Sequence, residues 1–297
     1  QWEAYARPTA GADDWRDEID IVLQTVSPEI IAICTPVTSA NDINAGQIKA
    51  ELLRQGLAQR TIILFTTAGI NPATQNWSEY VTALTQIVAG VAAYRCGVVP
   101  QLHGDNLGVL VGRLCRGDVS VADSPMRVST GPLLQNWTEP VDSDGVPLSS
   151  AVLAALDDLR FSVPHRYPDY DGIYWADGNL LDAEGGDYQV IENLRVVDKA
   201  ARKIRIIEIR MIADRSVNST TISQALTINK LMAPLREMSS STIFANRQFP
   251  GEIEPPKNGD IKLVWKSKTS LETYFSLTPY GSPKKIDTYL FLDLTQL

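Results

Sequence analysis

The chain has 297 residues, of which 44% are hydrophobic and 21% are charged, so it is long enough for one large domain or two ordinary ones and should bury a substantial core. It contains no run of about 18 apolar residues and no basic leader before an apolar stretch, which argues against a membrane span and against a secretion signal. A net charge of −8 argues against nucleic-acid binding, because an acidic protein repels phosphate overall.

The charge is unevenly distributed along the chain. Residues 1–198 carry 12 basic and 26 acidic side chains, a net charge of −14, whereas residues 199–297 carry 15 basic and 9 acidic ones, a net charge of +6. An acidic part joined to a basic part allows copies of the chain to attract one another head to tail. The alternative is that the basic residues simply solvate strands and helices near the C-terminus, and both explanations remain open.

Strands and helices alternate over the first 130 residues. Near-continuous apolar runs predict buried parallel strands at residues 29–34, 61–65 and 96–99, and a last edge strand is predicted at 119–128. Apolar residues at helical spacing predict helices at residues 15–23, 43–55, 77–88 and 104–114. This alternation predicts an open, layered α/β unit with a mostly parallel sheet.

Two of these helices have informative faces. In helix 43–55 we expect Ile48, Leu52 and Leu53 on the inner face. Helix 104–114 has glycines spaced by four residues, which would leave a smooth ridge where another backbone can come close. These glycines are Gly104, Gly108 and Gly112.

The following stretch, residues 136–148, is polar and contains two prolines and a glycine, which predicts a linker. We therefore expect an α/β layered domain over residues 1–135 and an α+β C-terminal assembly domain over residues 149–297. In the second domain, helices are predicted at 148–159, 191–211 and 220–232, and Pro234 should kink or end the last of them. Asp198 lies four residues before Arg202 on the polar side of helix 191–211, which should add a little helix stability.

The C-terminal domain should end in β-structure. Strands are predicted at 172–175, 261–266 and 271–277, and a final strand at 286–294. That final strand is apolar on both faces, so it is either the centre of its own sheet or inserted into the sheet of another subunit. One face would carry Ile286, Leu290, Leu292 and Leu294, and the other Tyr289 and Phe291.

Three stretches resemble a known family. Residues 172–210 join an aromatic strand, a Gly/Asp loop, the segment DYQVIENLRVVDKAAR and a basic apolar helix. Residues 98–133 (VVPQLHGDNLGVLVGRLCRGDVSVADSPMRVSTGPL) and 234–250 (PLREMSSSTIFANRQFP) fit the same pattern. Together they resemble the contractile tail-sheath proteins of myovirus-type phages and phage-like particles.

The resemblance implies a structural subunit and not an enzyme, with no cofactor and no bound metal. Such a subunit polymerises helically around a tail tube and contracts to drive the tube through a bacterial envelope. Its expected partners are further copies of itself, the tail tube protein, and baseplate and tail terminator proteins. It would be assembled in the bacterial host cytoplasm and reside in the virion tail, of either an infectious phage or a phage-derived bacteriocin-like particle.

The resemblance also implies where subunits would join. Sheath subunits are linked by terminal arms that add strands to the sheet of an adjacent subunit, with the α/β unit outside and the C-terminal unit nearer the tube. On that basis part of residues 286–294 donates or receives a strand. Charged residues should add contacts between copies, and we name Lys284 and Lys285 together with Asp182 and Asp187.

Two other classes remain as alternatives. An α/β enzyme or ligand-binding protein would use the strand ends near Thr35, Thr67 and His103, where His103 precedes Asp105 by two residues and Cys96 or Cys115 is a conceivable nucleophile. However, the chain lacks G-x-G-x-x-G, G-x-x-x-x-G-K-[ST] and G-x-S-x-G motifs. The second alternative is that the chain is another virion part, such as a tube or baseplate component.

Metal and disulfide chemistry have weak support. The stretch Asp142-Ser143-Asp144-Gly145 looks like the start of a calcium loop but lacks the closing glutamate. The three cysteines, Cys34, Cys96 and Cys115, are sparse and form no C-x-x-C pair, so we expect reduced thiols buried as small hydrophobic groups.

Overall fold

A parallel sheet of three strands lies at the centre of the N-terminal unit in the computed structural model, which describes residues 4–7, 15–135, 137–244 and 246–289. The order is β1 (Ile30–Pro36), β2 (Ile62–Thr67) and β3 (Cys96–Pro100). In register, Ile63 of β2 lies opposite Ile31 of β1 and Cys96 of β3. Every residue of β2 is buried, as expected for a central parallel strand covered on both faces.

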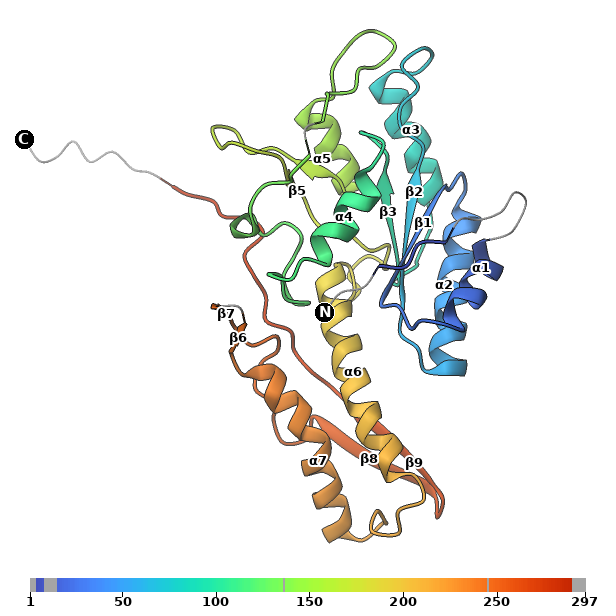
Figure 1. Ribbon diagram of the computed structural model, residues 1–297, viewed down its shortest axis with the longest axis vertical. Coiled ribbons are helices and arrows are strands. Elements are labelled where there is room, and N and C mark those ends of the chain that lie inside the picture. Colours follow the sequence, from blue (N-terminus) through green and yellow to red (C-terminus); the bar gives the residue numbers. More distant parts are fainter. Residues whose placement is uncertain (1–3, 8–14, 136, 245, 290–297) are drawn as a thin grey trace, which may run out of the picture.

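Helices cover both faces of this sheet (Figure 1). Alternate side chains of β2 point to opposite faces, so Ile63 and Phe65 belong to one core cluster while Ile62 and Leu64 belong to another. The first cluster includes buried residues of α1 (Trp15–Leu23), α2 (Ala40–Leu57), α3 (Trp77–Val88) and α5 (Ser150–Asp158). The second includes residues of α4 (Asn106–Leu114) and the start of α6 (Ile191–Met211).

The start of α3 shows how the local sequence determines where a helix begins. The Asn76 side chain accepts a hydrogen bond from the backbone N–H of Glu79 at 2.9 Å, and the Glu79 carboxylate accepts one from the backbone N–H of Asn76 at 3.1 Å. This reciprocal cap satisfies two of the N–H groups that a helix start leaves unpaired.

Two predictions about the N-terminal unit are wrong, one of them only in part. The prediction of the inner face of α2 is correct for Leu53, which is buried, but wrong for Ile48 and Leu52, which are each 61% exposed because Ile43 and Ala50 face the core instead. Residues 119–128 form turns and no strand, and they are followed by the short 3₁₀ helix η1 (Val128–Thr130). The side chains of Asp123 and Ser124 accept hydrogen bonds from backbone N–H groups in this stretch, which competes with a sheet ladder.

The C-terminal unit packs two long helices against a hairpin. Helix α6 from Val196 onward and α7 (Thr221–Ser239) from Ile228 onward share a core with β8 (Ile261–Ser267) and β9 (Ser270–Phe275), which pair antiparallel. The helix does not end at Pro234, because α7 continues through it for another turn, and the alternative of a kink at Pro234 stays a prediction. Pro234 is buried together with Leu231, Leu235 and Met238, so packing outweighs the lost backbone hydrogen bond.

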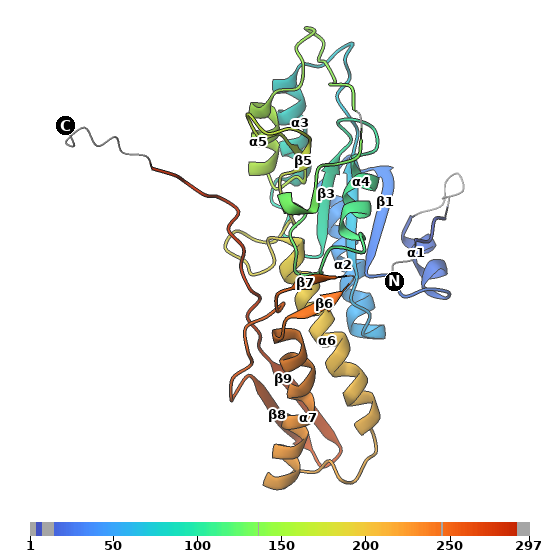
Figure 2. The same ribbon diagram turned by 60° about the vertical axis from the view of Figure 1, so that its left-hand side comes forward.

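Two very short antiparallel pairs complete the fold. β4 (Pro164–His165) pairs with β5 (Tyr174–Trp175), and β6 (Thr242–Phe244) pairs with β7 (Arg247–Phe249). The fold is thus a mixed α/β architecture with one parallel sheet and several antiparallel pairs, as the coarse prediction stated. The views in Figures 1 and 2 show an elongated molecule with the two units stacked end to end along α6.

Helix α6 connects the cores of the two units. Ile191 and Leu194 in its first turns belong to a core of the parallel sheet, whereas Val196, Ala200 and Ile204 belong to the core of the C-terminal unit. Residues 150–181 also pack into the core of the parallel sheet, through residues such as Leu156, Phe161 and Ala176. The division of the chain at residues 136–148 stays a prediction.

Candidate assembly surfaces

The chain after β9 returns across the C-terminal unit toward the α/β unit and then leaves the body of the molecule (Figure 1). Pro279 forms an isolated antiparallel bridge with Ile253, and the backbone N–H of Tyr280 donates to the carbonyl of Glu252 at 3.2 Å. Further on, Ile286 is 78% exposed and Tyr289 is 79% exposed. We call residues 285–297 the C-terminal arm.

The predicted final strand, residues 286–294, lies only partly within the described residues. Residues 286–289 belong to no sheet, so they do not form the central strand that one of the two expectations required. Four of the predicted assembly residues, Leu290, Phe291, Leu292 and Leu294, lie outside the described residues. In the described part of the arm, the two large apolar side chains of Ile286 and Tyr289 are therefore mostly exposed and are not covered by any other described residue.

The β8–β9 hairpin has a buried face and open edges. Ile261 is buried, and Leu263 and Phe275 pack partly against the core of α6 and α7. Among the described residues the sheet contains only these two strands, so the outer edge of each strand presents unpaired N–H and C=O groups. An open edge of this kind is a template for a further strand.

The end of the C-terminal unit where α6 leads into α7 combines exposed isoleucines with positive charge. Its large exposed apolar side chains are Ile206, Ile209, Ile212, Ile222 and Leu226. Arg205, Arg210 and Arg215 are exposed among them, and none of the three forms an ion pair with a described residue. We call these eight side chains the helical tip.

The four charged residues predicted for assembly lie in different settings. Lys284 makes ion pairs within its own chain, to Asp177 and Glu192 at 2.6 and 2.7 Å. Lys285 is exposed and lies 3.3 Å from the carboxylate of Asp287, also in the arm.

The two predicted acidic residues are not brought together with these lysines. The Asp182 carboxylate accepts backbone hydrogen bonds from Ala183 and Tyr188, both at 2.9 Å, and so shapes its own loop. Asp187 is exposed. The carboxylates that pair with Lys284 are those of Asp177 and Glu192, and neither pair was predicted from the sequence.

A buried ion-pair network was also missed. Arg95 donates two hydrogen bonds to the Asp198 carboxylate at 2.9 and 3.0 Å, and Arg195 donates one to Glu29 at 2.8 Å. Burial is the largest single effect and opposes the charge of Arg95, but its hydrogen bonds with Asp198, its attraction to that carboxylate and its contact with Tyr94 together outweigh burial and raise its pKa. The expectation that Asp198 lies on the polar side of its helix is wrong, because Asp198 is fully buried and faces the sheet.

The alternative site at His103 is occupied by internal contacts. Its ring stacks on Trp137 with centroids 4.3 Å apart, its backbone N–H donates to the Asn106 side chain at 2.7 Å, and Nε2 lies 3.8 Å from the Glu139 carboxylate. Burial lowers the pKa of His103 despite this carboxylate. The histidine therefore fastens residues 137–139 to the end of β3.

The conceivable nucleophiles are unsuited to that role. Cys96 is buried in the sheet with Sγ 3.6 Å from the carbonyl of Ile43, and burial raises the pKa of its thiol. Burial likewise raises the pKa of Cys115. Because the thiolate is the reactive form, both shifts make these groups poor nucleophiles. The prediction that all three thiols are buried is confirmed for Cys96 only, because Cys34 is exposed and Cys115 is only partly buried.

The calcium-like turn at Asp142 has a structural role. Its carboxylate accepts hydrogen bonds from the backbone N–H groups of Trp77, Asp144 and Val146. Across the part of the chain that the structure describes, no group of three or more His, Cys, Asp or Glu is arranged to hold a metal ion. Within the same part, no helix is long and apolar enough to cross a membrane.

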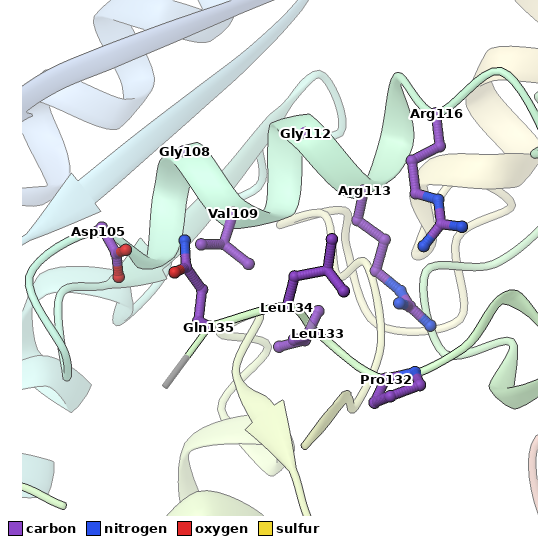
Figure 3. A pocket seen from close by; sticks show the side chains of 10 residues that line it. All are labelled: Asp105, Gly108, Val109, Gly112, Arg113, Arg116, Pro132, Leu133, Leu134 and Gln135. Carbon is purple, nitrogen blue, oxygen red and sulfur yellow. The ribbon is translucent and has the colours of Figure 1, made fainter. Parts of the chain in front are cut away.

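A cavity of about 410 Å³ lies between α4 and residues 132–135 (Figure 3). Gly108 and Gly112 line it, and an added Cβ at either position would meet nothing within 4 Å, so no described segment packs on this ridge. The Arg113 guanidinium, which also lines it, donates to the carbonyls of residues 125, 127 and 131. Its positive charge is thus engaged by the protein itself.

Comparison with known proteins gives a consistent result. A model of the DUF2586 N-terminal domain matches residues 1–179, and a model of the DUF2586 C-terminal domain matches residues 187–295. A protein assigned as a tail sheath protein of Haemophilus phage HP1 (strain HP1c1) is 49% identical over 253 residues, which cover 84% of this chain and 67% of the relative.

Solved structures of the same general fold come from contractile systems. The sheath complex of the extracellular contractile injection system PVC in its contracted state has a TM-score of 0.60 at 11% identity, covering 95% of this chain and 75% of that one. The baseplate of the anti-feeding prophage gives 0.56 at 12% identity, with 97% and 75% covered. A sheath tail protein from Desulfitobacterium hafniense gives 0.50 at 11% identity, with 91% and 57% covered.

Proposed function

Since this chain belongs to the DUF2586 family and is a subunit of a contractile tail sheath, we propose that it polymerises helically around a tail tube and that its C-terminal arm links neighbouring subunits. The chain is a structural protein and not an enzyme. In this account the assembled sheath contracts and drives the tube through a bacterial envelope. The sheath is assembled in the host cytoplasm and becomes part of the virion tail.

One observation carries the proposed linkage: the described part of the arm, residues 285–289, has exposed apolar side chains and no sheet partner, and it occurs in the same chain as a two-stranded sheet with open edges. Ile286 and Tyr289 on the arm gain burial only when another surface covers them. Within the described residues, the outer edges of β8 and β9 carry unpaired N–H and C=O groups, which a third strand would satisfy. We propose that residues 286–294 of one copy pair with an outer edge of β8 or β9 in an adjacent copy.

The helical tip supports a contact with the tail tube. Its isoleucines are exposed on a helical hairpin that projects away from the α/β unit, as Figure 1 shows. Arg205, Arg210 and Arg215 give this end a positive charge, which favours an acidic partner surface. In our proposal the C-terminal unit faces the tube, the α/β unit lies outside, and the two ends of the sheath contact the baseplate and the tail terminator.

The internal structure of the subunit suits a mechanical role. Helix α6 belongs to the cores of both units, and the buried pair Arg95–Asp198 fixes it against β3. Such a subunit moves as one body while contacts between subunits change. The energy for contraction would be stored in the extended lattice as a whole, and the strand links would hold while polar side-chain contacts are exchanged.

Deleting residues 286–297 tests the proposal. We expect the truncated chain to form no sleeves or polymers in negative-stain electron microscopy, while circular dichroism shows an unchanged fold, because the described part of the deleted segment contacts no core cluster. As a matched control, a synthetic peptide of residues 285–297 should inhibit assembly of the intact chain and a scrambled peptide should not. Polymers that persist after the deletion would show that the arm is not the link.

A further inference from the structure

Lys284 is held in a partly buried ion triad at the root of the C-terminal arm. Its ammonium group lies 2.6 Å from the Asp177 carboxylate and 2.7 Å from the Glu192 carboxylate. The side chains of all three are largely withdrawn from solvent, with 31%, 14% and 9% exposed respectively. The next residue differs sharply, because Lys285 is exposed and pairs only with Asp287 in the arm itself.

Both carboxylates of the triad are fixed by the fold. Asp177 also accepts hydrogen bonds from the Ser124 hydroxyl at 3.1 Å and from the backbone N–H of Gly178 at 2.8 Å. Glu192 is in the first turn of α6, where a negative charge is favoured by the helix dipole. One oxygen of Glu192 is buried without a hydrogen-bond partner among the described residues, so this carboxylate depends on Lys284 for compensation of its charge.

We propose that Lys284 is a positioning residue that clamps the root of the C-terminal arm to the α/β unit and to the start of α6, and so sets the point from which the arm reaches a neighbouring subunit. This inference rests on the proposed function, since the arm must act between copies. Residues 285–297 span at most about 45 Å when fully extended. A fixed root therefore limits which neighbours the arm can reach. The start of α6 moves with the whole subunit, so the set of neighbours within reach stays the same relative to the subunit.

Limited chymotrypsin digestion of the unassembled chain measures the clamp directly. Tyr280 and Tyr289 are both cleavage sites, and they lie on opposite sides of Lys284. With the clamp intact the chain around Tyr280 is anchored at both ends and should be cut slowly, whereas Tyr289 in the arm should be cut fast. In Lys284→Met we expect cleavage after Tyr280 to accelerate about tenfold or more, because local opening no longer has to break the triad. Cleavage after Tyr289 should not change.

Two matched variants separate clamping from general stability. Lys285→Met removes a neighbouring positive charge and should leave the ratio of the two cleavage rates as in the wild type. Lys284→Arg keeps the charge and should restore most of the protection of Tyr280. If Lys284→Met does not fold, Glu192→Gln provides the same test, because it leaves Lys284 with a single carboxylate and should also accelerate cleavage after Tyr280. A ratio equal to that of the wild type in the folded variant overturns the clamp.

Electron microscopy of the same samples distinguishes failure of the clamp from failure of the proposed function. We expect Lys284→Met to form fewer or irregular sleeves, although its rate of cleavage after Tyr289 is unchanged. We expect Lys284→Arg to form regular sleeves. Wild-type protein that forms no sleeves would refute the proposed function even if the cleavage ratio shifts. Regular sleeves from Lys284→Met would refute the role of the clamp in assembly and leave the proposed function standing.

Discussion

The Arg95 guanidinium donates two hydrogen bonds to the Asp198 carboxylate, at 2.9 and 3.0 Å, although the two residues are 103 positions apart in the chain. Both side chains are almost completely buried, with 2% and 1% exposed. Arg60 approaches the same carboxylate at 3.4 Å. The contact joins the residue that precedes β3 to the part of α6 where the helix passes from the core of the parallel sheet to the core of the C-terminal unit.

Removing one partner of this pair should destabilise the protein strongly. Asp198→Asn leaves the buried Arg95 charge with only the more distant Glu51 carboxylate, at 3.5 Å, and breaking a buried pair in this way typically costs about 3–5 kcal/mol of the free energy of unfolding. Urea denaturation followed by circular dichroism measures this loss. As a control, Lys203→Met breaks the exposed pair with Glu237 and should cost less than about 1 kcal/mol. Equal losses in the two variants would contradict the proposed role of the buried pair.

His103 should make stability depend on pH. Burial lowers its pKa in the folded chain, so below the ordinary histidine pKa of about 6.5 the unfolded chain binds a proton that the folded chain resists. Stability should therefore fall as the pH decreases from about 6.5 toward the lowered pKa of the folded state. Denaturation at several pH values should show a smaller decrease for His103→Gln than for the wild type.

The second histidine supplies the control for that measurement. His165→Gln should keep the wild-type pH dependence, because His165 does not take part in the contacts of the His103 ring with Trp137 and Glu139. If His103→Gln retains the full wild-type slope, burial of His103 is not its source.

Reversing the charge of the two neighbouring lysines should have different effects. Lys284→Glu places a third carboxylate beside Asp177 and Glu192, so we expect it to lower the thermal stability of the unassembled chain. Lys285→Glu changes an exposed position and should leave the fold intact, but it should weaken assembly and reduce its salt dependence if the basic arm meets an acidic neighbour. Thermal unfolding and light scattering at two salt concentrations measure both effects. If Lys285→Glu assembles like the wild type and with the same salt dependence, the positive charge of the arm does not contribute to assembly.

The parallel sheet and its helices could be predicted because their signals are local. The apolar runs at 29–34, 61–65 and 96–99 and the helical spacing at 77–88 indicate buried strands and an amphipathic helix without knowledge of any distant contact. The exposure of Ile48 and the continuation of α7 through Pro234 could not be predicted this way. Both depend on which face of a helix the rest of the fold covers.

The candidate surfaces also differ in whether their features could be predicted from local sequence. The apolar character of the arm is visible in its sequence, and the structure shows the described part of it exposed at Ile286 and Tyr289. The partners of Lys284 are 107 and 92 positions away, so only the folded chain reveals that this lysine is used internally. The prediction that Lys284 contributes a contact between copies stays a prediction.

The central claim is that the arm of one subunit binds to a neighbouring subunit. The most direct test is a cryo-electron microscopy reconstruction of the assembled polymer in which adjacent copies are resolved. We expect residues 286–294 of one copy to run as a strand along the outer edge of β8 or β9 in a neighbouring copy, with backbone hydrogen bonds between them. An arm that pairs with its own chain, or that touches no neighbour in a regular polymer, would contradict the account.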